Sequence, residues 1–174
     1  MNIVDIRVFV DNIIKEFSMP VNRGKQFEKV IQKTLEQIED VDCTRLYDQV
    51  SGFVEVSKNP SDFIVYKYPY RYYVECKTTH GASIPINNLT QLNRIAEKCN
   101  KKGVFGKFII WFVDKQETYW VDYRYILTWL TLKRKSINHT VLREVSKENN
   151  LVKLIPAKYA RVFGKYEFST IWEK

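Results

Sequence analysis

The segment SDFIVYKYPYRYYVECKTT, residues Ser61–Thr79, decides the fold. Its alternating Phe, Ile, Val and Tyr residues predict two β-strands, and the turn residues at 68–70 predict that the strands pair as an antiparallel hairpin. Side chains two residues apart share a face of a strand, so Glu75 and Lys77 are expected to point the same way. The register centred on the turn places Asp62 opposite Glu75.

Two ionised carboxylates at neighbouring strand positions repel each other unless a cation lies between them. Mg²⁺, or Mn²⁺ in its place, suits such a site because it takes oxygen ligands from carboxylates, from a backbone carbonyl such as that of Cys76, from water and from a substrate phosphate. The ammonium group of Lys77 would orient the attacking water. The hairpin therefore predicts phosphodiester hydrolysis, with an ordinary exposed pair of cross-strand charges as the alternative.

Helical and strand patterns continue on both sides of the hairpin. Apolar spacing predicts a helix over residues 3–17 and another over 25–38. The other expected elements are a strand with an irregular connection over 43–55, a helix over 87–103, strands over 107–113 and 118–123, helices over 124–134 and 139–149, and a strand-like segment over 160–172. This order predicts an α/β fold, a mixed sheet flanked by helices.

No linker divides the chain, so one domain is expected over residues 1–174. Within it we expect an N-terminal helical extension over 1–20, a core over about 22–129 and a basic C-terminal extension over 130–174. The three scattered cysteines and the lack of a signal-like or membrane-length apolar run predict a cytoplasmic protein with no membrane partner.

Basic residues outnumber acidic ones by 28 to 20, which gives a formal net charge of +8 and favours a polyanionic partner. The candidate DNA contacts are the basic residues Arg45, Lys58, Lys133, Arg134 and Lys135. Lys107 belongs to a further scattered set. For each such residue the alternative to a phosphate contact is a solvated surface charge.

Four short motifs follow one another in a familiar order. They are NRGKQFE at 22–28, PSDF at 60–63, ECK at 75–77 and IPINNLTQ at 84–91. Together they resemble the PD-(D/E)XK nuclease superfamily, and within it the RecU-type Holliday-junction resolvases of Gram-positive bacteria and their phages. The resemblance covers about residues 22–129.

The resemblance implies roles for individual residues. Glu28 corresponds to the acidic residue of the first catalytic helix and joins Asp62 and Glu75 as a metal ligand. Lys77 corresponds to the catalytic lysine, and Gln91 is implied to be a neighbour of the active site.

The resemblance also implies a restriction-endonuclease-like fold and a Mg²⁺-dependent homodimer that cuts four-way DNA junctions symmetrically. One departure bears on the substrate: RecU proteins carry a long basic stalk before the Asp motif, whereas this chain has only the segment at 42–60. Two alternatives remain, a restriction-type or flap endonuclease of the same fold and a non-catalytic DNA-binding modulator of recombination.

Overall fold

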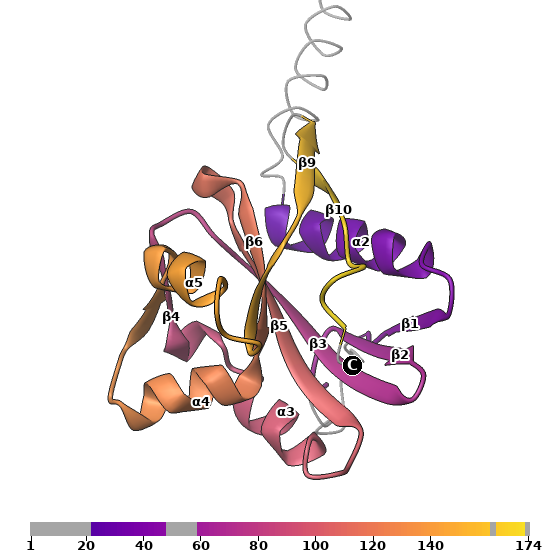
Figure 1. The fold of residues 1–174 in the computed structure, drawn as a ribbon, viewed down its shortest axis with the longest axis horizontal. Helices are drawn as coiled ribbons and strands as arrows, with labels where there is room; N and C mark the ends of the chain where they lie inside the picture. The colour runs from indigo at the N-terminus through magenta and orange to yellow at the C-terminus, as the bar shows by residue number, and fades with distance from the viewer. Residues whose placement is uncertain (1–21, 48–58, 161–162, 173–174) are drawn as a thin grey trace, which may run out of the picture.

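The computed structural model describes residues 22–47, 59–160 and 163–172 (Figure 1). The helix predicted over 3–17 and the candidate DNA contact Lys58 lie outside these residues. Within the described residues, no helix has both the length and the apolar character needed to cross a bilayer.

A six-stranded sheet forms the centre of the molecule, with the order β1-β2-β3-β5-β6-β8. All neighbours are antiparallel except β3 and β5, which run parallel. The sheet strands are β1 (Val41–Arg45), β2 (Phe63–Lys67), β3 (Tyr70–Thr79), β5 (Val104–Phe112), β6 (Glu117–Asp122) and β8 (Val152–Ile155). The predicted α/β class, a mixed sheet flanked by helices, is confirmed.

Helices cover both faces of this sheet (Figure 1). On one face lies α2 (Arg23–Glu36), whose residues Phe27, Ile31 and Leu35 are fully buried in a core with Val74. The other face holds a second apolar cluster. It is covered by α3 (Leu92–Lys98), α4 (Tyr123–Thr131) and α5 (His139–Val145).

Two small sheets complete the structure. The sequence predicted neither strand β8 of the central sheet nor strands β4, β7 and β9 of the small sheets. One small sheet pairs β4 (Ser83–Pro85) with β7 (Ser136–Asn138), and the other pairs β9 (Ala157–Ala160) with β10 (Phe163–Tyr166). Short 3₁₀ turns occur at η1 (Ile86–Asn88) and η2 (Val113–Lys115). These strands have only three or four residues each, too few for sequence alternation to reveal.

Several predicted boundaries are wrong. The helix expected over 87–103 is divided, because buried Leu89 adopts φ −91° and ψ 54°, outside the helical region, and α3 begins only at Leu92. The helices expected over 124–134 and 139–149 end early, at Thr131 and Val145. The strand-like segment over 160–172 reduces to β10.

Candidate functional site

The predicted hairpin register is confirmed. Phe63 pairs with Val74, and the same ladder continues to the turn. Strand β3 runs on to Thr79 beside β5, whereas β2 begins only at Phe63. The last part of β3, from Glu75 onward, therefore has no β2 partner, and its edge on that side is open to side chains.

Asp62 occupies this open edge. Its Oδ2 accepts a hydrogen bond of 2.8 Å from the backbone N–H of Cys76, so the carboxylate replaces the missing strand partner. The N–H and C=O of one strand residue point to the same side of the strand. The Cys76 carbonyl therefore faces the edge where Asp62 lies, as the prediction of a backbone oxygen ligand requires.

Glu75 and Lys77 share a face of β3, as predicted. The Lys77 ammonium lies 2.8 Å from Oε1 of Glu75, whose side chain is only 2% exposed. The second carboxylate oxygen, Oε2 of Glu75, is buried and has no hydrogen-bond partner among the described residues. An ionised carboxylate oxygen without a partner in such a place favours a further positive ligand.

Helix α2 contributes Glu28 from its second turn. Glu28 is paired with Arg45, whose role the sequence left open between a DNA contact and a solvated surface charge. Oε2 of Glu28 lies 2.5 Å from the guanidinium of Arg45, at the end of β1. Only 17% of the Arg45 side chain is exposed, and its guanidinium lies 5.9 Å from the centre of the Phe63 ring. Arg45 is thus packed against the site rather than solvated.

All three carboxylates have raised pKa values. Burial, followed by the charge of Asp62, raises the pKa of Glu75 to about 8. Burial also raises the pKa of Asp62, although the Cys76 N–H and Lys77 oppose the shift. The pKa of Glu28 is raised by burial and then by Asp62. At each carboxylate the effect of burial outweighs the neighbouring cations, so ionisation is unfavourable there without a further positive charge.

This set of oxygen donors fits a hard divalent cation that takes only a few ligands from the protein. Among the described residues, no three His, Cys, Asp or Glu side chains converge as a complete ligand group. Mg²⁺ needs fewer protein ligands than such a group supplies, since it is commonly held by one or two carboxylates together with waters and substrate phosphates. Asp62, the free oxygen of Glu75 and the Cys76 carbonyl meet this requirement, while Glu28 is engaged by Arg45.

The other predicted site residues lie outside this group of contacts. Gln91 precedes α3, and its Oε1 accepts a hydrogen bond of 2.8 Å from the Thr90 hydroxyl. Lys133, Arg134 and Lys135 are exposed in the connection between α4 and β7, on the side of the molecule away from α2 (Figure 1). Their assignment to DNA binding stays a prediction.

Lys107, expected at the surface, is buried. Its side chain is 1% exposed, and its ammonium lies 2.8 Å from Oδ2 of Asp122. The Asp122 carboxylate also accepts hydrogen bonds from Arg124. A fully buried, fully paired lysine is not available for phosphate contacts. This group joins β5, β6 and the start of α4 and stabilises their junction.

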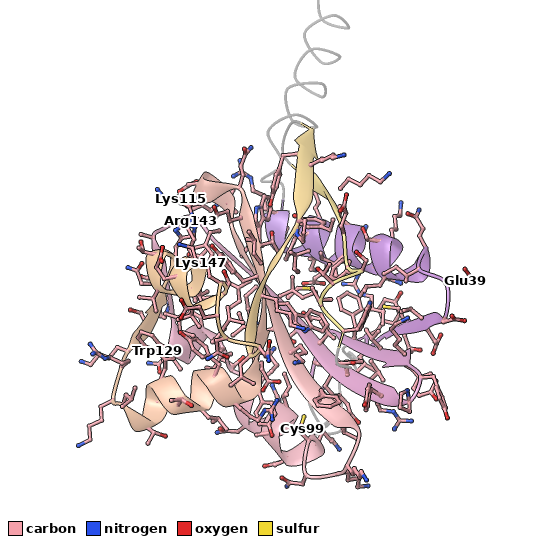
Figure 2. The ribbon with its side chains drawn as sticks, in the orientation of Figure 1. Glu39, Cys99, Lys115, Trp129, Arg143 and Lys147 are labelled. Carbon is pink, nitrogen blue, oxygen red and sulfur yellow. The ribbon has the colours of Figure 1, made fainter. Side chains whose placement is uncertain are left out.

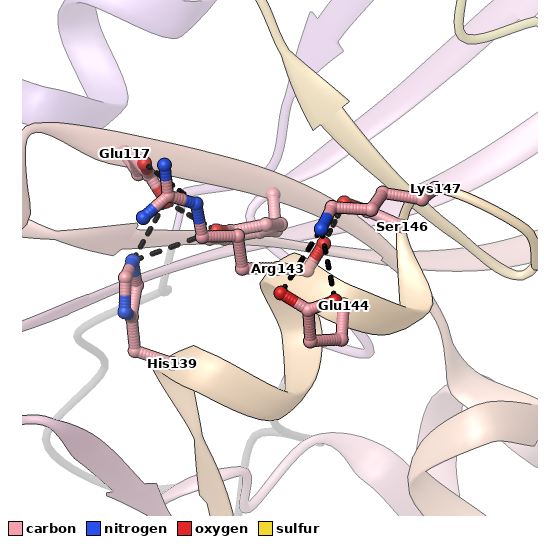
Figure 3. Close-up of polar contacts among 7 residues, drawn as sticks. Glu117, His139, Arg143, Glu144, Ser146 and Lys147 are labelled. Carbon is pink, nitrogen blue, oxygen red and sulfur yellow. Dashed lines mark hydrogen bonds and ion pairs between the residues drawn. The ribbon is translucent and has the colours of Figure 1, made fainter.

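The histidines and thiols have structural surroundings. His139 lies 2.7 Å from Glu117 (Figure 3). It also packs edge-on against the Phe112 ring. Exposed His80 lies 3.2 Å from Asp114. Burial raises the pKa of Cys99 to about 11, so this free thiol, near the lower end of the view in Figure 2, stays protonated and is no nucleophile.

Replacing Arg45 by glutamine should destabilise the protein. Glu28 would lose its neutralising partner, and we expect a loss of about 1–3 kcal/mol in the free energy of unfolding at pH 8. The loss should shrink at pH 4.5, where Glu28 is more fully protonated. Urea titration measures both values. Arg143→Gln is the matched control, because Arg143 is 61% exposed and 3.8 Å from Glu117. Equal effects of the two substitutions would contradict a special role for Arg45.

Comparison with known proteins gives similarity in structure but none in sequence. No protein-family model matches the chain, and no curated protein matches it by sequence. Among solved structures, the fold is similar to that of Hjc, a Holliday junction resolvase from the archaeal hyperthermophile Archaeoglobus fulgidus. The TM-score is 0.46 with 15% sequence identity, over 68% of this chain and 90% of that chain. The roles of residues in this chain therefore rest on its own geometry.

Proposed function

We propose that the protein is a Mg²⁺-dependent DNA endonuclease. The observation that carries the proposal is the pair of carboxylates at the open edge of β3, Asp62 and Glu75. Both have raised pKa values, and Glu75 has a buried oxygen without a partner among the described residues. Burial raises both pKa values, whereas the paired carboxyl of Asp122 has a lowered pKa, and this difference supports a cation site at Asp62 and Glu75.

Asp62, Glu75 and the Cys76 carbonyl would hold the metal, which supplies Lewis-acid stabilisation of the phosphate and activation of water when bound. The hydrogen bond from the Cys76 N–H fixes Asp62 and orients its carboxylate. Lys77 lies on the same face as Glu75 and would hold the attacking water and offset negative charge on the phosphate oxygens. Arg45 would bind a neighbouring phosphate once Glu28 is shared with the metal.

Within this activity, we propose that the substrate is a four-way DNA junction and that the active form is a homodimer. The order of the motifs from Asn22 to Gln91 supports this assignment. A twofold dimer presents two identical sites, which symmetric cutting of two strands requires. Sedimentation measurements that show a single protein chain on the junction DNA would overturn the proposed homodimer.

The test compares a synthetic four-way junction with a linear duplex of the same sequence, each with Mg²⁺, Mn²⁺ or EDTA. We expect cutting of the junction with either metal and none in EDTA. Lys77→Ala should lower the rate by about 100-fold or more without preventing DNA binding. Cutting that persists in EDTA would overturn the metal mechanism. Equal cutting of junction and duplex would indicate a restriction-type nuclease, and binding without cutting would indicate a recombination modulator.

A further inference from the structure

Five exposed lysines lie on α2 and on the hairpin of β9 and β10, and we name them the lysine surface: Lys25, Lys29, Lys33, Lys158 and Lys165. The two elements are joined in space. The rings of Phe27 on α2 and Tyr166 on β10 lie 5.9 Å apart, and the hairpin extends beyond α2 at the upper edge of the view (Figure 1).

On α2 the lysines follow a helical stripe. Lys25, Lys29 and Lys33 are four residues apart, so they lie about 6 Å apart along one side of the helix. This stripe is on the side opposite the buried residue Phe27. Like charges at this spacing repel one another, and a polyanion lying along the stripe would relieve that repulsion.

In the hairpin the lysines are direct cross-strand partners. Lys158 pairs with Lys165, and like charges in this arrangement are also unfavourable. The neighbouring pair, Tyr159 and Gly164, is packed instead: the Tyr159 hydroxyl is 3.2 Å from that of Thr118, and a Cβ at position 164 would lie 3.2 Å from the Tyr159 ring. The hairpin is therefore held in place while both lysines stay exposed.

Two exposed cations at and just after α5 have acidic neighbours. Lys147, just after α5, lies 2.8 Å from Glu144, and Arg143 on α5 lies 3.8 Å from Glu117 (Figure 3). Figure 2 shows these two cations together on that side of the molecule. By contrast, none of the five lysines of the lysine surface forms an ion pair with an acidic residue in the part of the chain that the structure describes.

We propose that the lysine surface binds the phosphate backbone of DNA beside the cleavage site. Phosphates would supply negative charge to these five lysines, which have no acidic partner among the described residues, and binding would release counterions. The placement agrees with the proposed nuclease function, on which this inference rests, because Glu28 lies on the same helix as the stripe, and the charge of Lys25 acts on it. DNA bound at the proposed metal site would continue over α2 towards the hairpin.

The test measures duplex binding in EDTA, where the proposed cleavage cannot occur, as a function of salt. Three double variants each remove two exposed positive charges: K29Q/K33Q on the stripe, K158Q/K165Q on the hairpin, and K101Q/K102Q as the matched control. The control residues lie in the turn before β5, at the end of the molecule opposite the hairpin (Figure 1). The logarithm of the binding constant falls with the logarithm of the salt concentration. Each of the first two variants should make this slope shallower by about 2, and the control should change it by much less.

Thermal unfolding of the same variants separates binding from folding. Because like charges are removed, the midpoints of K29Q/K33Q and K158Q/K165Q should stay unchanged or rise slightly. Equal slopes in all three variants would overturn the proposal, since net charge alone would then attract DNA and the five lysines would serve another anionic partner, such as an acidic protein segment. Wild type that binds with the expected slopes but never cuts would overturn the nuclease and leave the lysine surface standing.

Discussion

Asp62→Asn is expected to abolish DNA cleavage while leaving the protein folded. Asparagine keeps the size of the side chain and an oxygen that can accept the Cys76 N–H, which the carboxylate now accepts at 2.8 Å. It removes the charge that would bind the metal. Loss of outer partners of metal sites typically costs about 10–100-fold, so loss of this ligand should lower the rate by more than about 100-fold.

The same substitution should not destabilise the metal-free protein. Asp62 raises the pKa values of Glu75 and Glu28 through its charge, so its neutralisation relieves repulsion. We expect the free energy of unfolding at pH 8 to stay equal or to rise by about 1 kcal/mol. Asp42→Asn, at an exposed position of β1, is the control and should keep full activity. Lost activity together with a marked loss of stability would mean that Asp62 is structural.

The hairpin at the centre of the site was accessible from sequence because its information is local. A turn at 68–70 and alternating apolar residues fix the register within a short segment, and the observed pairing of Phe63 with Val74 follows from them. The faces of Glu75 and Lys77 follow from the strand period alone. The core of α2 was equally predictable, since its apolar stripe has helical spacing.

The contacts between distant segments were not accessible. Nothing local to Arg45 indicates that Glu28, seventeen residues earlier, is its partner. Lys107 looked like a surface cation because its burial depends on Asp122 of the neighbouring strand. The lysine stripe on α2 did carry a signal, the spacing of four residues, but only the structure shows that the hairpin with Lys158 lies beside it.

The stability of the metal-free protein should fall as the pH rises from about 4.5 to about 8. Burial and the charge of Asp62 raise the pKa of Glu75 from 4.5 to about 8 in the folded state. The folded protein therefore binds more protons than the unfolded chain in this range, and the slope of the unfolding free energy with pH is negative. The contribution of Glu75 is fully present below pH 4.5 and is lost through pH 8, a change on the order of several kcal/mol.

Urea unfolding of wild type and Glu75→Gln in EDTA at pH 5 and pH 8 measures this contribution as the difference between their pH dependences. The glutamine variant should lose most of the decline, whereas Glu39→Gln, an exposed control in the turn after α2 (Figure 2), should retain it. Mg²⁺ should reverse the trend for wild type, because a bound cation favours the ionised carboxylates. A decline of the same size in wild type and Glu75→Gln would show that Glu75 does not titrate in this range, and would remove the electrostatic argument for a cation beside it.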